Sequence, residues 1–195
     1  MKQTLTAKAG DCTLEVSASK KTANTLQLAY SFHNQSFQNA YLFNQLYDKR
    51  NPARIYETSR NRVYVELEGN PVIVILSKKI APVPPDKDVE KPVIPCVTLV
   101  RAGEQFEVTI SLALPLRPWT PYNKPTDSEL TASPAERPAY FELGYFLTTP
   151  EGDRLAKPVE TSEGPALYFY PFPTSSQQLI RVGPLPASVP VRLPK

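Results

Sequence analysis

Proline limits the possible folds of this chain more than any other residue type. The sequence holds 22 prolines among 195 residues, more than twice the usual frequency. Because proline lacks a backbone donor and fixes φ, long helices have little room, and strands and extended loops remain. Hydrophobic residues make up 41% of the chain and charged residues 21%, which is typical of a packed globular protein.

Two segments show a strict two-residue alternation of apolar and polar side chains. Alternate side chains of a strand face opposite sides of the sheet, so this pattern predicts half-buried antiparallel strands. The apolar residues predicted to face the core are Leu26, Leu28, Tyr30 and Phe32 in the first segment, and Phe106, Val108, Ile110, Leu112 and Leu114 in the second.

Weaker alternation and short apolar runs bring the predicted total to about nine strands. Their ranges are 12–17, 25–32, 62–67, 71–76, 97–100, 105–114, 140–148, 166–170 and 178–182. Strands at this spacing, separated by turn-forming residues, predict an all-β chain folded as an antiparallel β-sandwich. The segments 68–71 and 149–153 are predicted to be hairpin turns.

Three segments lack the strand pattern. The segment 40–48 is either a short helix or an irregular strand. Segments 81–95 and 116–137 are rich in proline and poor in periodic apolar residues. We interpret these two as long loops that cross between the sheets of one domain covering residues 1–195.

Charge and hydropathy argue against two classes of partner. The formal net charge is +3, and basic residues cluster only in doublets such as Lys20-Lys21 and Lys78-Lys79, which does not predict a nucleic-acid partner. The longest apolar run, 72–76, is far shorter than the roughly 20 residues that cross a bilayer, so no membrane partner is expected. The first residues do not resemble a secretory signal, and a cytoplasmic location with Cys12 and Cys96 as free thiols is expected.

Nucleophilic catalysis would need residues that this sequence barely offers. His33 is the single histidine, and it is predicted at an exposed strand end beside Asn34, a turn-former. Cys12 is predicted to face the core, where a thiol is inert. Cys96 is predicted to be more exposed, but a catalytic role would also need His33 and an orienting group nearby.

Metals, cofactors and acid–base catalysis also find little support. One histidine and two cysteines are too few for a zinc site, no glycine-rich nucleotide motif occurs, and no cofactor is expected. Glu66 and Glu68 share a strand face, which leaves a carboxylate-dependent hydrolase open. We expect these carboxylates to be the polar side of an ordinary strand and the chain not to be an enzyme.

Two aromatic clusters are the candidate recognition sites. Arg117, Trp119 and Tyr122 lie in a segment that prolines stiffen, and Tyr168 and Tyr170 alternate with apolar neighbours. Arginine, tryptophan and tyrosine are enriched at binding hot spots. The alternative is that Trp119 covers the edge of the sandwich and that the second cluster packs beneath a long loop.

The segment 97–108, VTLVRAGEQFEV, resembles a recurring passage of bacterial immunoglobulin-like sandwich domains. In that passage a strand leads through a Gly-Glu turn into an alternating strand. The resemblance covers a small part of the chain, implies an immunoglobulin-like sandwich, and carries no functional residues.

The sequence therefore predicts a non-catalytic β-sandwich that binds another protein, for example a bacterial immunity or adaptor protein that occludes its partner. Two other functions remain open. A carbohydrate-binding module would present Trp119, Tyr122 and Tyr168 as a flat exposed platform, and a hydrolase would hold two carboxyl groups in an acidic cleft.

Overall fold

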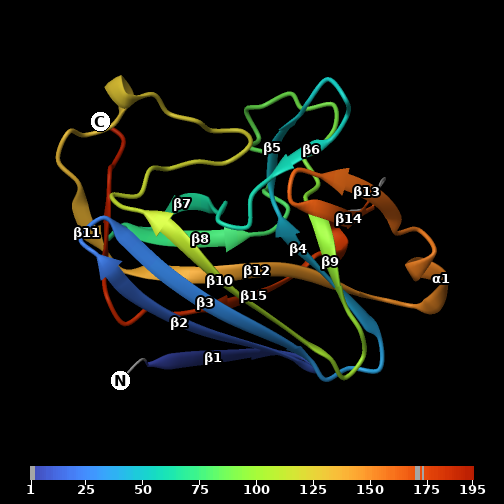
Figure 1. The fold of residues 1–195 in the computed structure, drawn as a ribbon. Helices are drawn as coiled ribbons and strands as arrows, with labels where there is room; N and C mark the ends of the chain where they lie inside the picture. The colour runs from blue at the N-terminus through green and yellow to red at the C-terminus, as the bar shows by residue number, and fades with distance from the viewer. Residues whose placement is uncertain (1–2, 170–171, 173) are drawn as a thin grey trace.

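The computed structural model describes residues 3–169, 172 and 174–195, and the regular secondary structure of this part is almost entirely β-strand (Figure 1). It contains sixteen strands, one four-residue α-helix, α1 (Pro150–Asp153), and two short 3₁₀ turns. The all-β prediction is confirmed. Each of the nine predicted segments overlaps a strand, but the predicted total of about nine was too low.

One layer is a four-stranded antiparallel sheet in the order β1-β2-β3-β10. Its strands are β1 (Thr4–Ala9), β2 (Cys12–Thr22), β3 (Thr25–Asn34) and β10 (Gln105–Ala113). Burial alternates along β3 as predicted, with Leu26, Leu28, Tyr30 and Phe32 inside. On β10 and just after it, Ile110, Leu112 and Leu114 are buried, while Phe106 and Val108 are partly buried against the same core.

A ten-stranded sheet forms the opposing layer and extends beyond it. Its path is β5-β6-β13-β14-β9-β4-β12-β8-β7, with β15 also paired to β12. The strands are β4 (Asn39–Gln45), β5 (Tyr47–Arg50), β6 (Tyr56–Thr58), β7 (Tyr64–Glu68), β8 (Ile73–Lys78), β9 (Cys96–Val100), β12 (Ala139–Thr148), β13 (Lys157–Thr161), β14 (Gly164–Tyr168) and β15 (Gln178–Val182).

This larger sheet corrects the prediction of a wholly antiparallel sandwich. The pairs β8–β12 and β6–β13 are parallel. Parallel neighbours need a crossover of a dozen or more residues between them, and the long segment between β8 and β12 provides one.

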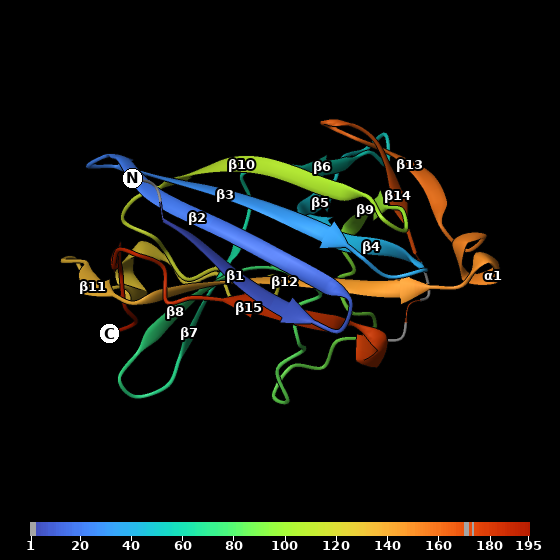
Figure 2. The same cartoon turned by 90° about the horizontal axis from the view of Figure 1, so that it is seen from below.

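The main hydrophobic core lies between the two layers. Seen from below, β1 and β2 of the smaller sheet lie in front of β12 of the larger one (Figure 2). Aromatic rings meet across the interface: the centroids of Tyr30 and Phe141 are 4.8 Å apart, and those of Phe32 and Tyr145 are 5.1 Å apart. Sheets that face each other in this way have the packing of a β-sandwich.

The segment 40–48 forms strands β4 and β5, so its short-helix interpretation was wrong. Ala40 and Leu42 enter the main core, whereas Tyr41 and Phe43 enter a second core on the other face of the sheet. A strand buried on both faces shows no two-residue alternation, which is why periodicity did not separate it from a helix.

The predicted hairpin at 68–71 joins β7 to β8 and is confirmed. The one at 149–153 is wrong: this segment contains α1, and β12 and β13 have other partners. Segment 81–95 contains no strand, but 116–137 ends in β11 (Ala135–Arg137), which pairs with β16 (Val189–Val191) in a separate two-stranded sheet. Such three-residue strands are too short for a detectable period.

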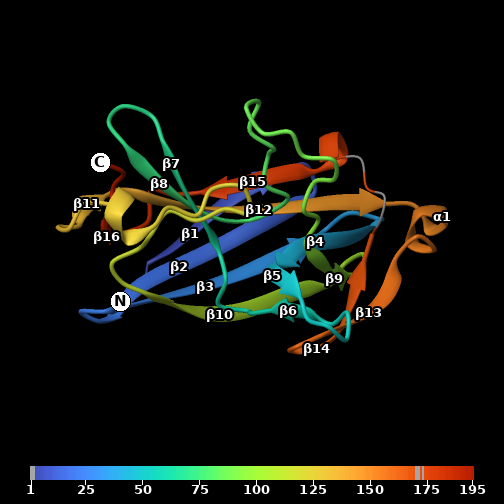
Figure 3. The ribbon, with the colours of Figure 1, turned by 90° about the horizontal axis from the view of Figure 1, so that it is seen from above.

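Figures 1 and 3 show β5, β6, β13 and β14 gathered at one end of the molecule, away from β11. Strands distant in sequence therefore meet there and bring their side chains together. Among the helices that the structure describes, none has the length and apolar character needed to span a membrane.

Candidate functional site

Trp119 closes one edge of the large sheet. Its backbone exchanges two hydrogen bonds with Val65, with N···O distances of 2.9 and 3.0 Å. Its partly buried ring lies 5.2 Å from the ring of Tyr64, while the cationic groups of Arg62 and Lys124 each lie 5.6 Å from the indole. The ring of Trp119 is thus half-buried, and the two cationic groups lie beside it.

Tyr122 and Arg117 also make contacts within their own loop region. The Tyr122 hydroxyl accepts a 2.9 Å hydrogen bond from the backbone N–H of Val93, so it ties the loop 116–137 to the loop 81–95. Arg117 lies 3.2 Å from Asp127 in an ion pair. Within this predicted cluster, Tyr122 thus links the two loops, and Arg117 makes an ion pair inside the loop 116–137.

Tyr168 lies in a different place, among the strands gathered at the far end of the large sheet. Its ring centroid is 5.3 Å from that of Tyr56, which in turn is 4.7 Å from that of Tyr47. Tyr170, the other predicted residue of this cluster, lies outside the described residues. The structure does not bring Tyr168 together with Trp119 in one hydrophobic cluster.

These three tyrosines line a pocket of about 640 Å³, which we call the Arg50 pocket. Strands β5, β6, β13 and β14 form most of it, and the loop 81–95 adds one wall. The lining residues are Tyr47, Arg50, Arg54, Tyr56, Lys91, Pro92, Val93, Val159, Glu160 and Tyr168. Aromatic walls with a few converging polar groups are typical of binding sites.

Positive charge dominates the Arg50 pocket. The Arg50 guanidinium lies 4.1 Å from the Tyr56 ring centroid and 5.9 Å from that of Tyr168, and it donates a hydrogen bond to the Tyr56 hydroxyl. Within the described part of the chain, neither Arg50 nor Arg54 forms an ion pair with an acidic residue. Glu160 is the one carboxylate among the lining residues, so an anionic group would meet unneutralised guanidinium groups here.

Arg54 reaches this pocket from a strained turn. Its φ is 63°, the only positive value at a non-glycine among the described residues. The backbone N–H of Arg54 donates to the carbonyl of Asn51 at 2.8 Å, and the Asn51 side chain accepts from Ile55 at 3.0 Å. Such a conformation costs on the order of 1–2 kcal/mol, and strained residues of this kind cluster at functional sites.

Cys96 is fully buried in the hydrophobic cluster beside the Arg50 pocket, which corrects the prediction that it is more exposed. Burial raises the pKa of its thiol to about 12, although the charge of Arg50 acts in the opposite direction. His33 lies on β3 in the other sheet and contacts Ser31 and Glu15. Cys12 and Cys96 are both free, buried thiols, and neither has the features of a nucleophile.

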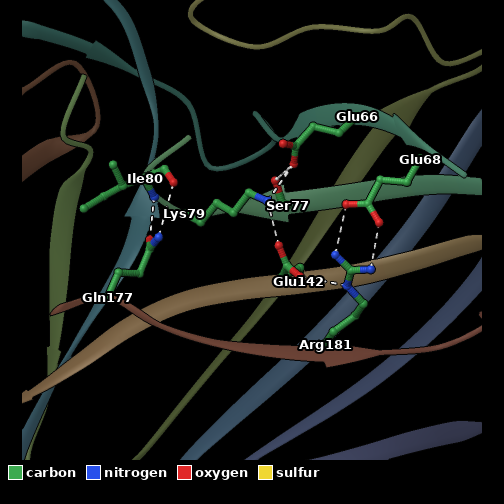
Figure 4. Close-up of polar contacts among 8 residues, drawn as sticks. All are labelled: Glu66, Glu68, Ser77, Lys79, Ile80, Glu142, Gln177 and Arg181. Atoms are coloured by element: carbon green, nitrogen blue, oxygen red, sulfur yellow. Dashed lines mark hydrogen bonds and ion pairs between the residues drawn. The ribbon is translucent and has the colours of Figure 1, made fainter. Parts of the chain in front are cut away.

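Glu66 and Glu68 belong to a charge network across β7, β8, β12 and β15 (Figure 4). Lys79 Nζ lies 2.9 Å from Glu66 and 2.6 Å from Glu142, and Arg181 bonds both Glu142 at 2.8 Å and Glu68 at 2.9 Å. Burial opposes the ionisation of Glu142, but the bonds from Lys79 and Arg181 outweigh it and lower its pKa. A general acid needs a raised pKa, so Glu142 is not suited to that role.

Asn34 shows a buried polar site that the sequence did not reveal. It was expected near an exposed strand end, yet it is 1% exposed. Its side-chain amide donates to the backbone carbonyls of Gln38 at 2.8 Å and Val100 at 3.0 Å, and its oxygen accepts from Ser36. These bonds give Asn34 a structural role in fixing the β3–β4 connection.

No group of three or more His, Cys, Asp or Glu side chains suited to a metal occurs in the described ranges. Comparison of the chain with protein-family models, with curated proteins and with solved structures finds no match.

Proposed function

We propose that this chain is a non-catalytic β-sandwich that binds another protein, and that the Arg50 pocket receives an acidic segment of that partner. The observation that carries the proposal is the Arg50 guanidinium, stacked on Tyr56 and without an acidic partner among the described residues. Stacking holds the planar fork in place, so less side-chain entropy is lost when a carboxylate binds it.

The composition of the pocket suits a peptide better than a nucleic acid. Tyr47 and Tyr168, both half-buried, offer aromatic contact area next to the apolar side chains of Pro92 and Val159, while Tyr56 is buried beneath Arg50. Tyrosine and arginine are the residues that dominate protein-binding hot spots. A nucleic acid would instead favour an extended basic stripe, and the formal net charge of the chain is only +3.

An immunity or adaptor protein that occludes its partner in the cytoplasm is one form of this proposal. Such a protein needs a stable scaffold and one complementary surface, without catalytic groups. An immunoglobulin-like relationship is part of the same proposal. Its support is the four-stranded antiparallel sheet packed against a second sheet.

Affinity capture with charge-reversed variants tests the function. Wild-type protein, Arg50→Glu and Lys49→Glu would be used to capture partners from the native source, followed by quantitative mass spectrometry. Lys49 is the matched control, because it is the adjacent residue and pairs with Glu57 at 3.8 Å instead of lining the pocket. We expect wild type and Lys49→Glu to recover the same stoichiometric partner and Arg50→Glu to lose it.

Two results would contradict the proposal: equal recovery by Arg50→Glu, or no stoichiometric partner for the wild type. Where the wild type recovers a partner, acidic peptides derived from that partner would be titrated against wild type and Arg50→Glu by fluorescence polarisation. Peptide binding that persists in Arg50→Glu would place the interface elsewhere.

A further inference from the structure

The side-chain amino groups of Lys78 and Lys79 lie on opposite faces of the large sheet. Lys79 is 6% exposed and lies between Glu66 and Glu142 in the charge network of Figure 4. Lys78 is 1% exposed, and its Nζ donates to the backbone carbonyls of Asn44 and Arg60, both at 2.9 Å. Among the described residues, no carboxylate lies within ion-pair distance of Lys78.

Lys78 lines a second pocket of about 310 Å³, which we call the Lys78 pocket. It lies between the two layers, where β10 is the edge strand of the smaller sheet. Its lining residues are Tyr30, Asn44, Gln45, Arg60, Lys78, Thr98, Phe106, Glu107, Val108, Glu163 and Pro165. This set shares no residue with the Arg50 pocket, so the two sites are distinct.

Three polar side chains that line the Lys78 pocket bond one another, and an ion pair lies at its exposed side. The Thr98 hydroxyl donates to Asn44 Oδ1 at 2.8 Å and accepts from Gln45 Nε2 at 3.2 Å. Arg60 and Glu163 lie 3.7 Å apart, and their side chains are 69% and 33% exposed. The Lys78 pocket thus has a polar interior and a charged rim.

The contacts of Lys78 match those of a neutral amine. An ammonium has three donors to satisfy, whereas a neutral amine has two and a lone pair. Two carbonyls accept from Nζ, so a neutral amine would be fully bonded with its lone pair directed elsewhere. Burial lowers the pKa of Lys78 to about 7, with Arg62 acting in the same direction and Glu163 against it.

We propose that Lys78 is a reactive amine that captures small aldehydes or ketones entering the Lys78 pocket. The Nζ lone pair attacks the carbonyl carbon and forms a C–N bond. The two amine hydrogens leave with the carbonyl oxygen as water, and a C=N double bond remains, so no oxidant or reductant is required. Asn44, Gln45 and Thr98 provide hydrogen-bonding groups for polar substituents of the compound, and the volume restricts it to a small molecule.

Reductive trapping tests this site. The folded chain would be treated with acetaldehyde and cyanoborohydride at pH 7.5, and the rate of modification of each lysine would be followed by peptide mapping. A freely exposed lysine is almost wholly protonated at this pH, so we expect Lys78 to react on the order of ten times faster than exposed Lys8. Lys79, equally shielded but paired with two carboxylates, should react slowest.

Two variants complete the experiment. Lys78→Met should abolish the fast adduct and leave the modification of Lys8 unchanged. Arg60→Ala keeps the backbone carbonyl that bonds Lys78 but shortens the rim side chain, and it should accelerate the reaction at Lys78 alone. This second variant and the wild type still decide the question if Lys78→Met does not fold.

The alternative is that Lys78 is a structural ammonium that joins two backbone segments. It would then be as unreactive as Lys79 while Lys8 is modified, and that outcome would overturn the proposal. A pH–rate profile adds a second criterion: the reaction at Lys78 should have its midpoint near pH 7, and a midpoint near pH 10 would contradict the proposal.

Discussion

Lys78 also affects stability, because its amine loses solvation on folding. Its pKa is about 7 in the folded chain and ordinary in the unfolded chain, so between these values the unfolded state binds more protons. Stability should therefore rise with pH from about 7 to about 10. Below pH 7 both states are protonated, and the full cost of burying the charge remains.

We predict that Lys78→Met removes this dependence, so that the free energy of unfolding of the variant no longer rises between pH 7 and pH 10. Urea unfolding of both proteins between pH 6 and 10 would measure the difference. Equal slopes with pH for the two proteins would show that Lys78 does not titrate in this range.

At the level of secondary-structure elements, the Lys79 network joins four strands through buried charges. Replacing Lys79 leaves Glu66 without its ion-pair partner and Glu142 with Arg181 alone, which is costly for carboxylates that are largely buried. We predict that Lys79→Met destabilises the chain by about 3–5 kcal/mol, and that adding Glu142→Gln restores part of the loss. Thermal or urea unfolding of the single and double variants measures the coupling free energy between Lys79 and Glu142.

The matched control is Lys124→Met, which removes an exposed ion pair with Asp48 and should cost less than about 1 kcal/mol. Equal losses for Lys79→Met and Lys124→Met would mean that the buried network contributes no more than a surface pair. Because the pKa of Glu142 is lowered in the folded chain, its contribution to the free energy of unfolding should disappear as the pH falls through this folded-state pKa.

The elements that could be predicted from the sequence are those with one face in the core. Apolar and polar side chains alternate clearly along β3 and β10, and this alternation predicts which face of each strand lies in the core. β4 is buried on both faces, and β11 and β16 have three residues each, so neither type carries a readable period.

The Arg50 pocket could be predicted only in part for a related reason. Tyr168 is one of the predicted recognition residues. Tyr47 lies in the segment 40–48, for which the sequence predicts either a short helix or an irregular strand, and Arg50 and Tyr56 follow that segment. The segment 47–56, YDKRNPARIY, is rich in tyrosine and basic residues, and this composition was the available signal. Its connection to Tyr168 depends on the parallel pairing of β6 with β13, which local sequence does not encode.

On the scale of the whole molecule, the two long loops are joined to each other by a hydrogen bond. Segment 116–137 holds segment 81–95 through the Tyr122–Val93 hydrogen bond, and Val93 with Pro92 lines the Arg50 pocket. The residues first expected to contact a partner therefore support the wall of a site elsewhere. Their effect on binding would be indirect, through the position of that wall.

We predict that Tyr122→Phe frees this wall without unfolding the sandwich. Losing one hydrogen bond costs about 1 kcal/mol, so global stability should change little, while amide hydrogen exchange in residues 81–95 should accelerate severalfold. Affinity for the partner recovered in the capture experiment should fall about fivefold. Arg117→Ala, which removes the ion pair with Asp127 in the same loop, is the control and should leave exchange in 81–95 unchanged. Unaltered exchange in Tyr122→Phe would show that the two loops are positioned independently, and that the wall of the Arg50 pocket is held by its own contacts.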